Sequence, residues 1–479
     1  MPLPTIPSGN VNSGLATGFN VANSCRFNDG DSAFLSKTLG TGTNTTKLTV
    51  SVWIKRSTLG TEQQIFETWN DNNNRFDILF KSSTDQLEIQ NTLSGSTTIN
   101  LKTNRVFRDP SAWMNIVVIV DSTQSTASNR VKLYINGTQE TSFATETYLN
   151  EDANLALGTS SYTNFIGKYS SSGGNFFDGY MCEVVYLDGT AASIGDLGEF
   201  DEDSPRIWKP KDVSGLTFGN NGAYLDFEDS SNLGNDANGG TDFTENNLAA
   251  TDQTTDTCTN NFATLNPLMN NVNNLPTLSE GNLEVLAVSG STWSVTPSTI
   301  GLPKKGKWVF EVEAVSGTSG DRAAFAGWMN PAVSNPLANG SILWRNVAST
   351  NSILSNDSAA TGSFSATTWG TDGHIIGMYI DMDNSKMYFT HNGTVQNSGT
   401  GIDFQGTFDD DTFILPVVMV INTDKLSVNF GNPASNFAIA SGNSDPNGYG
   451  NFEYSTTITG DGSSKSFYAI CTKNLAEYG

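Results

Sequence analysis

Short runs of alternating apolar and polar residues, each closed by a turn, recur along the whole chain and restrict its fold most strongly. Residues 48–56 read LTVSVWIKR, with an apolar residue at every second position, which is typical of a β-strand with one buried face. Residues 131–135 (VKLYI) lead directly into Asn136-Gly137, a dipeptide that favours a tight hairpin turn. Long helical periodicity is absent from the sequence. The pattern therefore predicts an all-β protein made of antiparallel sheets.

The second half of the chain carries the same kind of pattern. The strands predicted there are residues 308–313, 323–329, 374–381, 386–390, 413–421 and 425–430. Pro416 has no N–H to donate, so we expect it at a sheet edge or in a bulge. Residues 467–471 (FYAIC) are predicted to form the last strand.

Length and local composition divide the chain into two sandwich-forming regions. The 479 residues suffice for two β-sandwiches of about 200 residues each. Residues 228–279 are acidic and poor in β-branched apolar residues, which favours a linker, although Phe243 and Phe262 could pin it to a neighbouring domain. The predicted order is an extended N-terminal arm (1–18), a first sandwich (19–227), the polar linker (228–279) and a second sandwich (280–479).

The charge balance excludes several classes of partner. With 25 basic and 49 acidic residues, the formal net charge of −24 repels nucleic acids and anionic membranes. No stretch approaches the roughly 20 apolar residues of a membrane-spanning helix, and MPLPTIPSGNVNSG lacks the features of a secretion signal. The cysteines are spaced too widely for a C-x-x-C metal site, so we expect four buried thiols, with one cross-link as the alternative: Cys25, Cys182, Cys258 and Cys471.

Residues 19–227 resemble the laminin-G/pentraxin-like branch of the concanavalin A-like fold. The segments that carry the resemblance are SCRFNDGDSAFLSKT, LTVSVWIKRS, NIVVIVD with VKLYINGT, and FFDGYMCEVVYLDGT. The resemblance implies a jelly-roll sandwich. Members of this branch often bind a calcium ion at the sandwich rim. The resemblance therefore makes such an ion one expectation for this chain.

Residues 280–479 resemble a SPRY domain. The supporting segments are GKWVFEVEA, AFAGWMN, HIIGMYIDMDNSKMYFTHNG and FILPVVMVINTDKLSVNFG. In the third segment an apolar strand ends in Asp-x-Asp, turns, and returns through an aromatic strand to Asn-Gly. The resemblance implies a second β-sandwich that acts as a binding module without a catalytic centre.

The order of the two domains, with the acidic connector between them, resembles structural proteins of marine bacteriophages, including tail fibres and head-surface proteins. The implied location is the virion surface, after synthesis in the host cytoplasm and release by lysis. The implied partners are other virion proteins and a host surface glycan or protein. We also expect a homo-oligomer or many copies, because weak sites need repetition. The alternative is a decoration protein that binds capsid or tail subunits and no glycan.

Polysaccharide cleavage is the third alternative, because the concanavalin A-like fold also houses glycan hydrolases. Retaining hydrolysis needs two carboxylates about 5 Å apart. The nearest candidates along the chain are Glu311 with Glu313 and Asp381 with Asp383. We expect the first pair on a solvated sheet face and the second at a hairpin turn. The E-x-D-x-x-E signature of the fold's hydrolases and any G-x-S-x-G motif are missing, so the sequence predicts a protein that is not an enzyme.

Two sets of ligand-binding residues follow from these resemblances. Calcium prefers hard oxygen ligands, and the candidates in turns or loops are Asp29, Asp31, Asp71 and Asp178. Glycans are bound by flat aromatic faces beside amides, and the candidates are Trp69, Asn70, Asn72, Tyr162, Tyr169 and Phe176. In the second half, Trp328, Trp344 and Trp369 are further candidates, each expected in the core.

Overall fold

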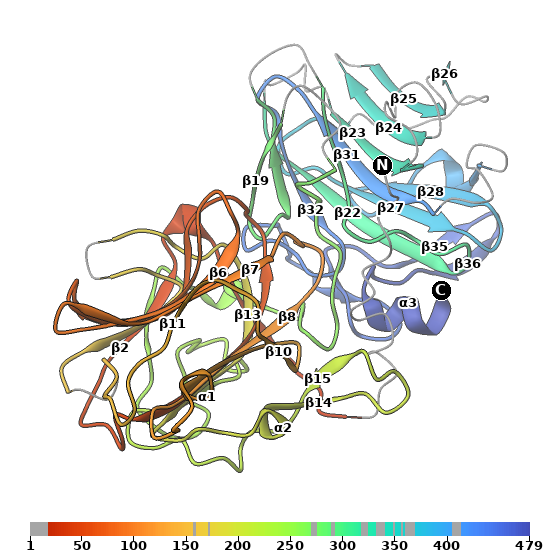
Figure 1. Ribbon diagram of the computed structural model, residues 1–479. Helices are drawn as coiled ribbons and strands as arrows, with labels where there is room; N and C mark the ends of the chain where they lie inside the picture. Colours follow the sequence, from red (N-terminus) through yellow and green to blue (C-terminus); the bar gives the residue numbers. More distant parts are fainter. Residues whose placement is uncertain are drawn as a thin grey trace. The chain divides into compact units, whose positions relative to one another are not determined.

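The computed structural model describes residues 18–156, 160–170, 173–269, 275–288, 293–317, 324–331, 341–347, 350–355, 358–359, 369–404 and 413–479 (Figure 1). These residues fall into two compact units, 18–259 and 260–479, and both consist mainly of antiparallel sheets. The predicted all-β fold is therefore confirmed. The N-terminal arm predicted for residues 1–18 lies outside the described residues except for Gly18.

Two eight-stranded sheets form the first unit. The strands of the first, the β3 sheet, are β1 (Ser24–Phe27), β3 (Lys47–Arg56), β8 (Met114–Asp121), β9 (Val131–Ile135), β10 (Thr138–Glu140), β13 (Gly179–Asp188), β16 (Ala223–Leu225) and β18 (Gln253–Thr254). The strands of the second, the β4 sheet, are β2 (Phe34–Thr38), β4 (Gln63–Asp71), β5 (Asn74–Phe80), β6 (Gln86–Leu93), β7 (Ser96–Val106), β11 (Phe143–Thr147), β12 (Thr163–Ile166) and β17 (Thr244–Asn246).

The order of strands in the β3 sheet is β10-β9-β8-β3-β13-β1-β18, with β16 beside β13, and that in the β4 sheet is β11-β7-β6-β5-β4-β12-β2-β17. The connections carry the remaining short elements: η1 (Asp29–Asp31), α1 (Ala127–Arg130), α2 (Ile194–Leu197), the β14–β15 pair (Gly198–Phe200 and Trp208–Pro210) and η2 (Ala250–Asp252).

Apolar side chains from the facing sides of the two sheets form the core of the first unit. Every second residue of β3 from Leu48 to Ile54 is buried there, and β5 contributes Phe76 and Phe80. Trp53 points to the other face of β3 and is buried in a separate apolar cluster. The alternation predicted for residues 48–56 is thus confirmed, and the β3 sheet is covered on both faces.

The segment expected as a linker is built into the two units. In the first unit β17 pairs with β2, β18 pairs with β1, and Phe243 lies in the core. A buried ion pair joins Lys55 on β3 to Asp256, with 2.8 Å between Nζ and Oδ2. Beyond residue 259 the chain belongs to the second unit, where Phe262 is buried. A few buried residues hold this segment in place, and polar turns lie between them. Because most of its residues are in these turns, its composition resembles that of a linker.

The second unit also contains two sheets. The strands of the β22 sheet are β19 (Thr277–Ser279), β20 (Glu284–Leu286), β22 (Lys307–Ser316), β27 (Ile375–Asp381), β28 (Lys386–His391), β29 (Thr394–Val395), β30 (Ile402–Asp403) and β32 (Lys425–Asn429). The strands of the β31 sheet are β21 (Ser294–Pro297), β23 (Ala324–Met329), β24 (Ser341–Val347), β25 (Thr350–Ser355), β26 (Ser358–Ala359) and β31 (Leu415–Val420). The core between them contains Trp328, Trp344 and Trp369, which are all fully buried.

In the β22 sheet the strand order is β19-β20-β32-β22-β27-β28-β29, with β30 beside β28, and in the β31 sheet it is β21-β31-β23-β24-β25-β26. The other elements are η3 (Asn397–Gly399), the hairpins β33–β34 (Asn443–Ser444 and Asn451–Phe452) and β35–β36 (Thr457–Gly460 and Ser463–Ser466), and α3 (Thr472–Tyr478). With seven residues, α3 is the longest helix in the described ranges, and none of these helices is long enough to cross a bilayer.

Two predictions for the second unit are wrong. Pro416 lies within β31, between β21 and β23, and not at an edge. It is tolerated because the paired residues of β21 begin at Val417, so the missing N–H falls at the end of that ladder. Residues 467–471 form only isolated bridges, one between Tyr468 and Trp308 of β22 and one between Cys471 and Phe262, and no continuous ladder.

The expected solvated face of β22 is also wrong. The C-terminal part of the chain covers it, and Glu311 and Glu313 are only 1% and 8% exposed. Glu311 accepts hydrogen bonds from the backbone N–H groups of Glu453 (2.9 Å) and Tyr454 (2.8 Å) and from Asn429 Nδ2 (3.2 Å). Burial raises the pKa of Glu311 to about 7, against the lowering effect of these donors. Glu311 therefore anchors the covering segment.

Candidate functional site

Two carboxyl groups from neighbouring strands meet on the β4 sheet. Glu67 on β4 pairs in register with Asp77 on β5, so their side chains share one face of the sheet. Their chain neighbours Phe66 and Phe76 point the other way, into the core. The pair therefore lies on the face of the sheet that is turned away from the core, yet the two residues are only 0% and 1% exposed.

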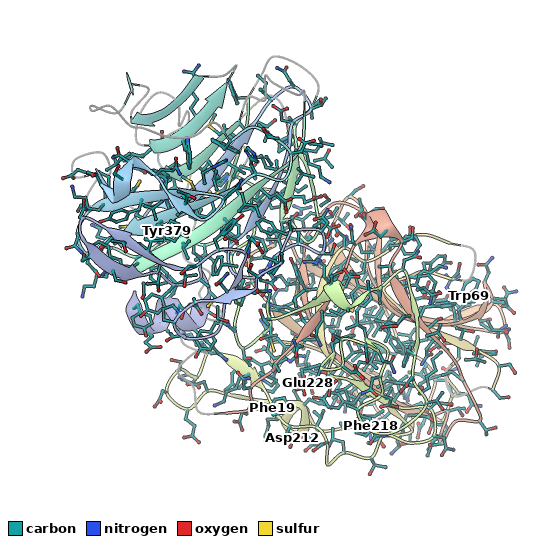
Figure 2. All side chains as sticks on the ribbon, turned by 180° about the vertical axis from the view of Figure 1, so that it is seen from behind. Phe19, Trp69, Asp212, Phe218, Glu228 and Tyr379 are labelled. Atoms are coloured by element: carbon teal, nitrogen blue, oxygen red, sulfur yellow. The ribbon has the colours of Figure 1, made fainter. Side chains whose placement is uncertain are left out.

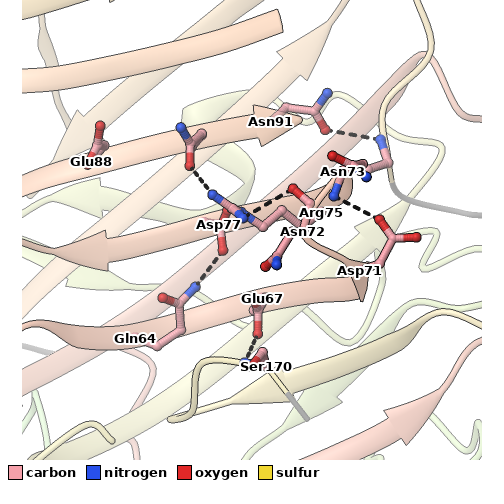
Figure 3. A network of polar contacts seen from close by, with 12 residues as sticks. Gln64, Glu67, Asp71, Asn72, Asn73, Arg75, Asp77, Glu88, Asn91 and Ser170 are labelled. Atoms are coloured by element: carbon pink, nitrogen blue, oxygen red, sulfur yellow. Dashed lines mark hydrogen bonds and ion pairs between the residues drawn. The ribbon is translucent and has the colours of Figure 1, made fainter. Parts of the chain in front are cut away.

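A polar network surrounds the two carboxyl groups (Figure 3). Arg75 Nε donates to Asp77 Oδ2 over 2.9 Å, and Gln64 Nε2 donates to Asp77 Oδ1 over 3.3 Å. The backbone N–H of Ser170, from the segment after β12, donates to Glu67 Oε2. The segment after β12 therefore covers Glu67. The polar network connects this segment to β4 and β5.

The carboxyl pair titrates abnormally. Burial raises the pKa of Glu67 far above its ordinary value, the charge of Asp77 raises it further, and the Ser170 N–H opposes the rise. Burial also raises the pKa of Asp77, but Arg75 counteracts part of this. The two residues are direct partners in the β4–β5 register. Both carboxyl groups therefore have a raised pKa, and that of Glu67 is raised more.

An aromatic pair lies beside this network. The rings of Trp69 and Tyr169 meet edge to face, with centroids 5.6 Å apart, and both side chains are partly exposed. The guanidinium of Arg75 lies 5.9 Å from the centre of the Tyr169 ring. Trp69 is found at the periphery of the first unit (Figure 2). Partly exposed rings next to fixed polar groups are suited to stacking on a sugar ring.

The other predicted glycan ligands are distributed around this pair. Asn70 and Asn72 are exposed at the β4–β5 turn, and Arg75 Nη1 donates to the Asn72 carbonyl over 3.3 Å. Tyr162 is partly exposed and lies near Asp71. Burial raises the pKa of Tyr162, and the charge of Asp71 raises it further. These residues therefore extend the surface around Trp69.

Phe176 belongs to a different group. Its ring packs against Phe34, with centroids 6.2 Å apart. The Nζ of Lys168 lies 4.1 Å from the centre of Phe34, 5.7 Å from that of Phe165 and 5.8 Å from that of Phe176. The three rings thus surround a lysine of the same chain, which already occupies their faces.

The four candidate calcium ligands are placed as follows. Asp29 and Asp31 are exposed in η1, and Asp31 Oδ2 accepts from Asn28 Nδ2 over 2.8 Å. Asp71 caps its turn by accepting from the Asn73 N–H over 2.8 Å. Asp178 is buried and accepts from the Thr58 hydroxyl. Across the part of the chain that the structure describes, no three His, Cys, Asp or Glu side chains are grouped so that they could hold a metal ion.

In the second unit the acidic hairpin matches its prediction in part. Asp381 caps the turn after β27, accepting from the N–H and the Nδ2 of Asn384 over 3.2 Å and 2.9 Å. Asp383 instead accepts from the Gly306 N–H and pairs with Lys307 at 2.6 Å. Their role is to tie the hairpin to the start of β22.

Sequence reasoning did not find Glu67 and Asp77. It searched for acids at alternate positions along one strand, whereas these two lie on different strands, ten positions apart. A signal was present in FETWNDNNNRFD, because a turn at Asp71–Asn74 places residues 67 and 77 opposite each other. The burial of the pair by Ser170 had no such signal, since that contact spans 103 positions.

Residues 28–191 match the family described as the concanavalin A-like lectin/glucanases superfamily. The matched range contains most strands of the first unit, among them β4 and β5, and so includes the carboxyl pair and the aromatic pair. The concanavalin A-like fold expected for the first half is therefore confirmed. No curated protein matches the chain.

Three solved structures are similar to parts of the chain. The SPRY domain of human HERC1 is 16% identical over 34% of this chain and 96% of its own, with a TM-score of 0.27. A putative carbohydrate binding protein from Bacteroides ovatus ATCC 8483 is 15% identical over 48% of this chain and 59% of its own (TM-score 0.32). Domain 4 of AbnA, a GH43 extracellular arabinanase from Geobacillus stearothermophilus, in complex with arabinotriose, is 17% identical over 33% of this chain and 66% of its own (TM-score 0.25).

Proposed function

We propose that this protein binds a glycan on the outer face of the β4 sheet and does not cleave it. The observation that carries the proposal is the partly exposed pair of Trp69 and Tyr169 beside the ordered network of Arg75 and Asp77. A sugar ring would stack on the aromatic rings, and the exposed amides of Asn70 and Asn72 would supply hydrogen bonds.

Binding is favoured over cleavage by the geometry of the carboxyl groups. Glycosidases hold their two carboxyl groups about 5 Å or more apart, so that the scissile bond fits between them. Glu67 and Asp77 are partners in the β4–β5 register and are almost completely buried, at 0% and 1% exposed. A scissile sugar bond cannot reach between carboxyl groups that are buried in this way, so the pair is unsuited to attack from two sides.

The proposal is tested by measuring glycan binding with Trp69→Ala and Tyr169→Ala. A Trp side chain at the centre of a binding site contributes about 2 kcal/mol, so each variant should lose roughly thirtyfold in affinity. Phe200→Ala is the matched control, because Phe200 is an exposed aromatic residue (43%) on β14 of the same unit. Unchanged affinity in both test variants would contradict the proposal.

We propose further that the protein acts on the surface of a virus particle, in many copies, where repetition compensates for weak single sites. This proposal rests on the resemblance of its domain order and connector to phage structural proteins. Immunogold electron microscopy with an antibody to this chain tests it on particles from a lysate that expresses the protein. Label on heads or tails supports it, and its position separates a fibre from a decoration protein. Unlabelled particles would contradict it.

A further inference from the structure

A lysine on the outer face of the β4 sheet is held in place by aromatic rings. The Nζ of Lys168 lies 4.1 Å from the centre of the Phe34 ring. The ring centres of Phe165 and Phe176 follow at 5.7 Å and 5.8 Å. Such cation–π contacts position an ammonium group and leave its charge intact. Because Lys168 is partly exposed, that charge is accessible from the solvent.

The backbone on both sides of Lys168 is also fixed. The N–H of Gly167 donates to the Ile65 carbonyl over 3.1 Å. The N–H of Tyr169 donates to the Gly174 carbonyl, also over 3.1 Å. The lysine therefore needs little further ordering when a ligand binds, which lowers the entropic cost of forming an ion pair.

Other basic side chains of this sheet differ from Lys168 in their pairing or their place. Arg75 is paired with Asp77, with 2.9 Å between Nε and Oδ2. Lys102 lies on β7, three strands from β4, which is about 14 Å across the sheet. Lys168 precedes Tyr169 directly and, among the described residues, forms no ion pair.

The acidic residue beside Lys168 is Glu67, which is too buried to compete with a ligand. Burial lowers the pKa of Lys168, and the charge of Glu67 opposes that lowering. Glu67 is 0% exposed, and burial raises its own pKa, so it is less ionised near neutral pH than an ordinary glutamate. An anion that approaches Lys168 from the solvent therefore meets an available positive charge.

The strand register places this charge beside the aromatic pair of the proposed site. Phe165 on β12, against which Lys168 packs, pairs in register with Glu67 on β4. Trp69 follows Glu67 by two positions, so it shares the outward face with Phe165 and lies about 7 Å further along the strands. A glycan stacked on Trp69 and Tyr169 therefore has the ammonium group within reach of a neighbouring sugar.

We propose that the glycan bound on this face is acidic, and that Lys168 binds its carboxylate or sulfate group while Trp69 and Tyr169 stack on its rings. The inference rests on the proposed glycan site. The formal net charge of −24 repels anions at long range, but at physiological ionic strength exposed charges more than about 8 Å apart are largely screened. The direct contact with Lys168 therefore decides which glycan is preferred.

The preference is tested by titrating the full chain with three oligosaccharides that differ in one substituent. The first is a neutral hexose oligomer, the second carries a uronic acid and the third a sulfate ester. At least one acidic ligand should bind about tenfold more tightly than the neutral one at low salt, as one charge-assisted hydrogen bond provides. High salt should reduce this preference. The comparison of the two acidic ligands separates a carboxylate from a sulfate.

Three variants assign the preference to one side chain. Lys168→Met keeps an unbranched side chain against the rings but removes the charge, so the acidic ligand should bind no more tightly than the neutral one. Lys168→Arg keeps the charge and should retain the preference. Lys102→Met is the matched control, since Lys102 is another partly exposed lysine of the same sheet, and it should also retain the preference.

The outcomes separate this inference from the glycan site itself. A neutral ligand that wild-type protein binds as tightly as both acidic ligands would overturn the inference and leave the site in place. A preference that persists in Lys168→Met would do the same. Binding of none of the three ligands would overturn the site and the inference together.

Discussion

Each of the two units buries a glutamate on the outward face of a sheet, beneath a segment from elsewhere in its own unit, but the two glutamates are satisfied differently. Glu311 in the second unit receives three donors, two of them backbone N–H groups of the covering segment. Among the described residues, Glu67 in the first unit receives one donor, and it is paired in register with another carboxyl residue. The first arrangement is a completed anchor, since both carboxyl oxygens accept hydrogen bonds. The second leaves an acceptor unmet, which is the pattern expected of a functional site.

The largest effect should come from removing the completed anchor. Glu311→Ala leaves two buried N–H groups without acceptors, which should cost about 3 kcal/mol in the stability of the second unit. Hydrogen exchange in full-length protein should accelerate in residues 443–471, while residues of the first unit keep their rates. Asp403→Ala is the control, because that side chain is 58% exposed and its pair with Lys386 is a weak surface contact. Unchanged exchange in 443–471 would show that Glu311 does not hold the segment.

The contrast between the two glutamates also marks how far sequence reasoning reaches. The strands, the two sandwiches and the inward face of β3 follow from period-two alternation and turn dipeptides, which are local properties. The burial of Glu311 and Glu67 does not, because each is covered by a segment more than 100 positions away. Polarity alone therefore predicted a solvated face for Glu311, and alternation along one strand missed the cross-strand pair.

The candidate aromatic residues illustrate the same limit. Trp69 and Tyr169 were both predicted as glycan ligands from polar surroundings, and the structure places their rings together. Phe176 had the same local appearance, but Phe34 and Lys168 occupy its face. Whether an aromatic ring is available depends on partners that distant segments supply, and such partners are not visible in a local window.

A second, smaller effect concerns the pH dependence of stability, which should differ between Glu67 and Glu311. Both folded-state pKa values are raised, so each group's contribution to stability is complete below the ordinary pKa of a glutamate and is lost as pH rises through the folded value. For Glu311 that loss ends near pH 7, whereas for Glu67 it continues toward about 9. Between pH 7 and 8.5 Glu67 should account for a loss of about 2 kcal/mol in the first unit, at up to about 1.4 kcal/mol per pH unit. Glu67→Gln should remove that part of the slope and leave the part that comes from Glu183, whose pKa burial raises to about 8.

The measurement is urea denaturation of the full chain at several pH values, with hydrogen exchange around Ser170 to assign the transition to the first unit. Glu62→Gln is the control for loss of an acidic residue on the same side of the sheet, and it should keep the wild-type slope. A slope in Glu67→Gln as steep as in wild type would place the titrating group elsewhere.

The smallest effect should come from a third buried glutamate, which is intermediate between the other two. Glu183 on β13 is 5% exposed and has a positive φ of 51°. Within the described part of the chain it accepts one side-chain hydrogen bond, from the Tyr224 hydroxyl over 2.8 Å. Burial raises its pKa to about 8, and the hydrogen bond from Tyr224 opposes that rise.

Tyr224→Phe removes this donor and should cost about 1 kcal/mol of stability. The loss should be seen as a lower urea midpoint of the first unit at pH 9, where Glu183 is mostly ionised. Below pH 6 a protonated Glu183 no longer needs that donor as strongly, so the cost should shrink. Tyr134→Phe is the matched control, a partly buried tyrosine on β9 of the same sheet. A pH-independent cost would mean that the lost ring contacts, and not the donor, explain the change.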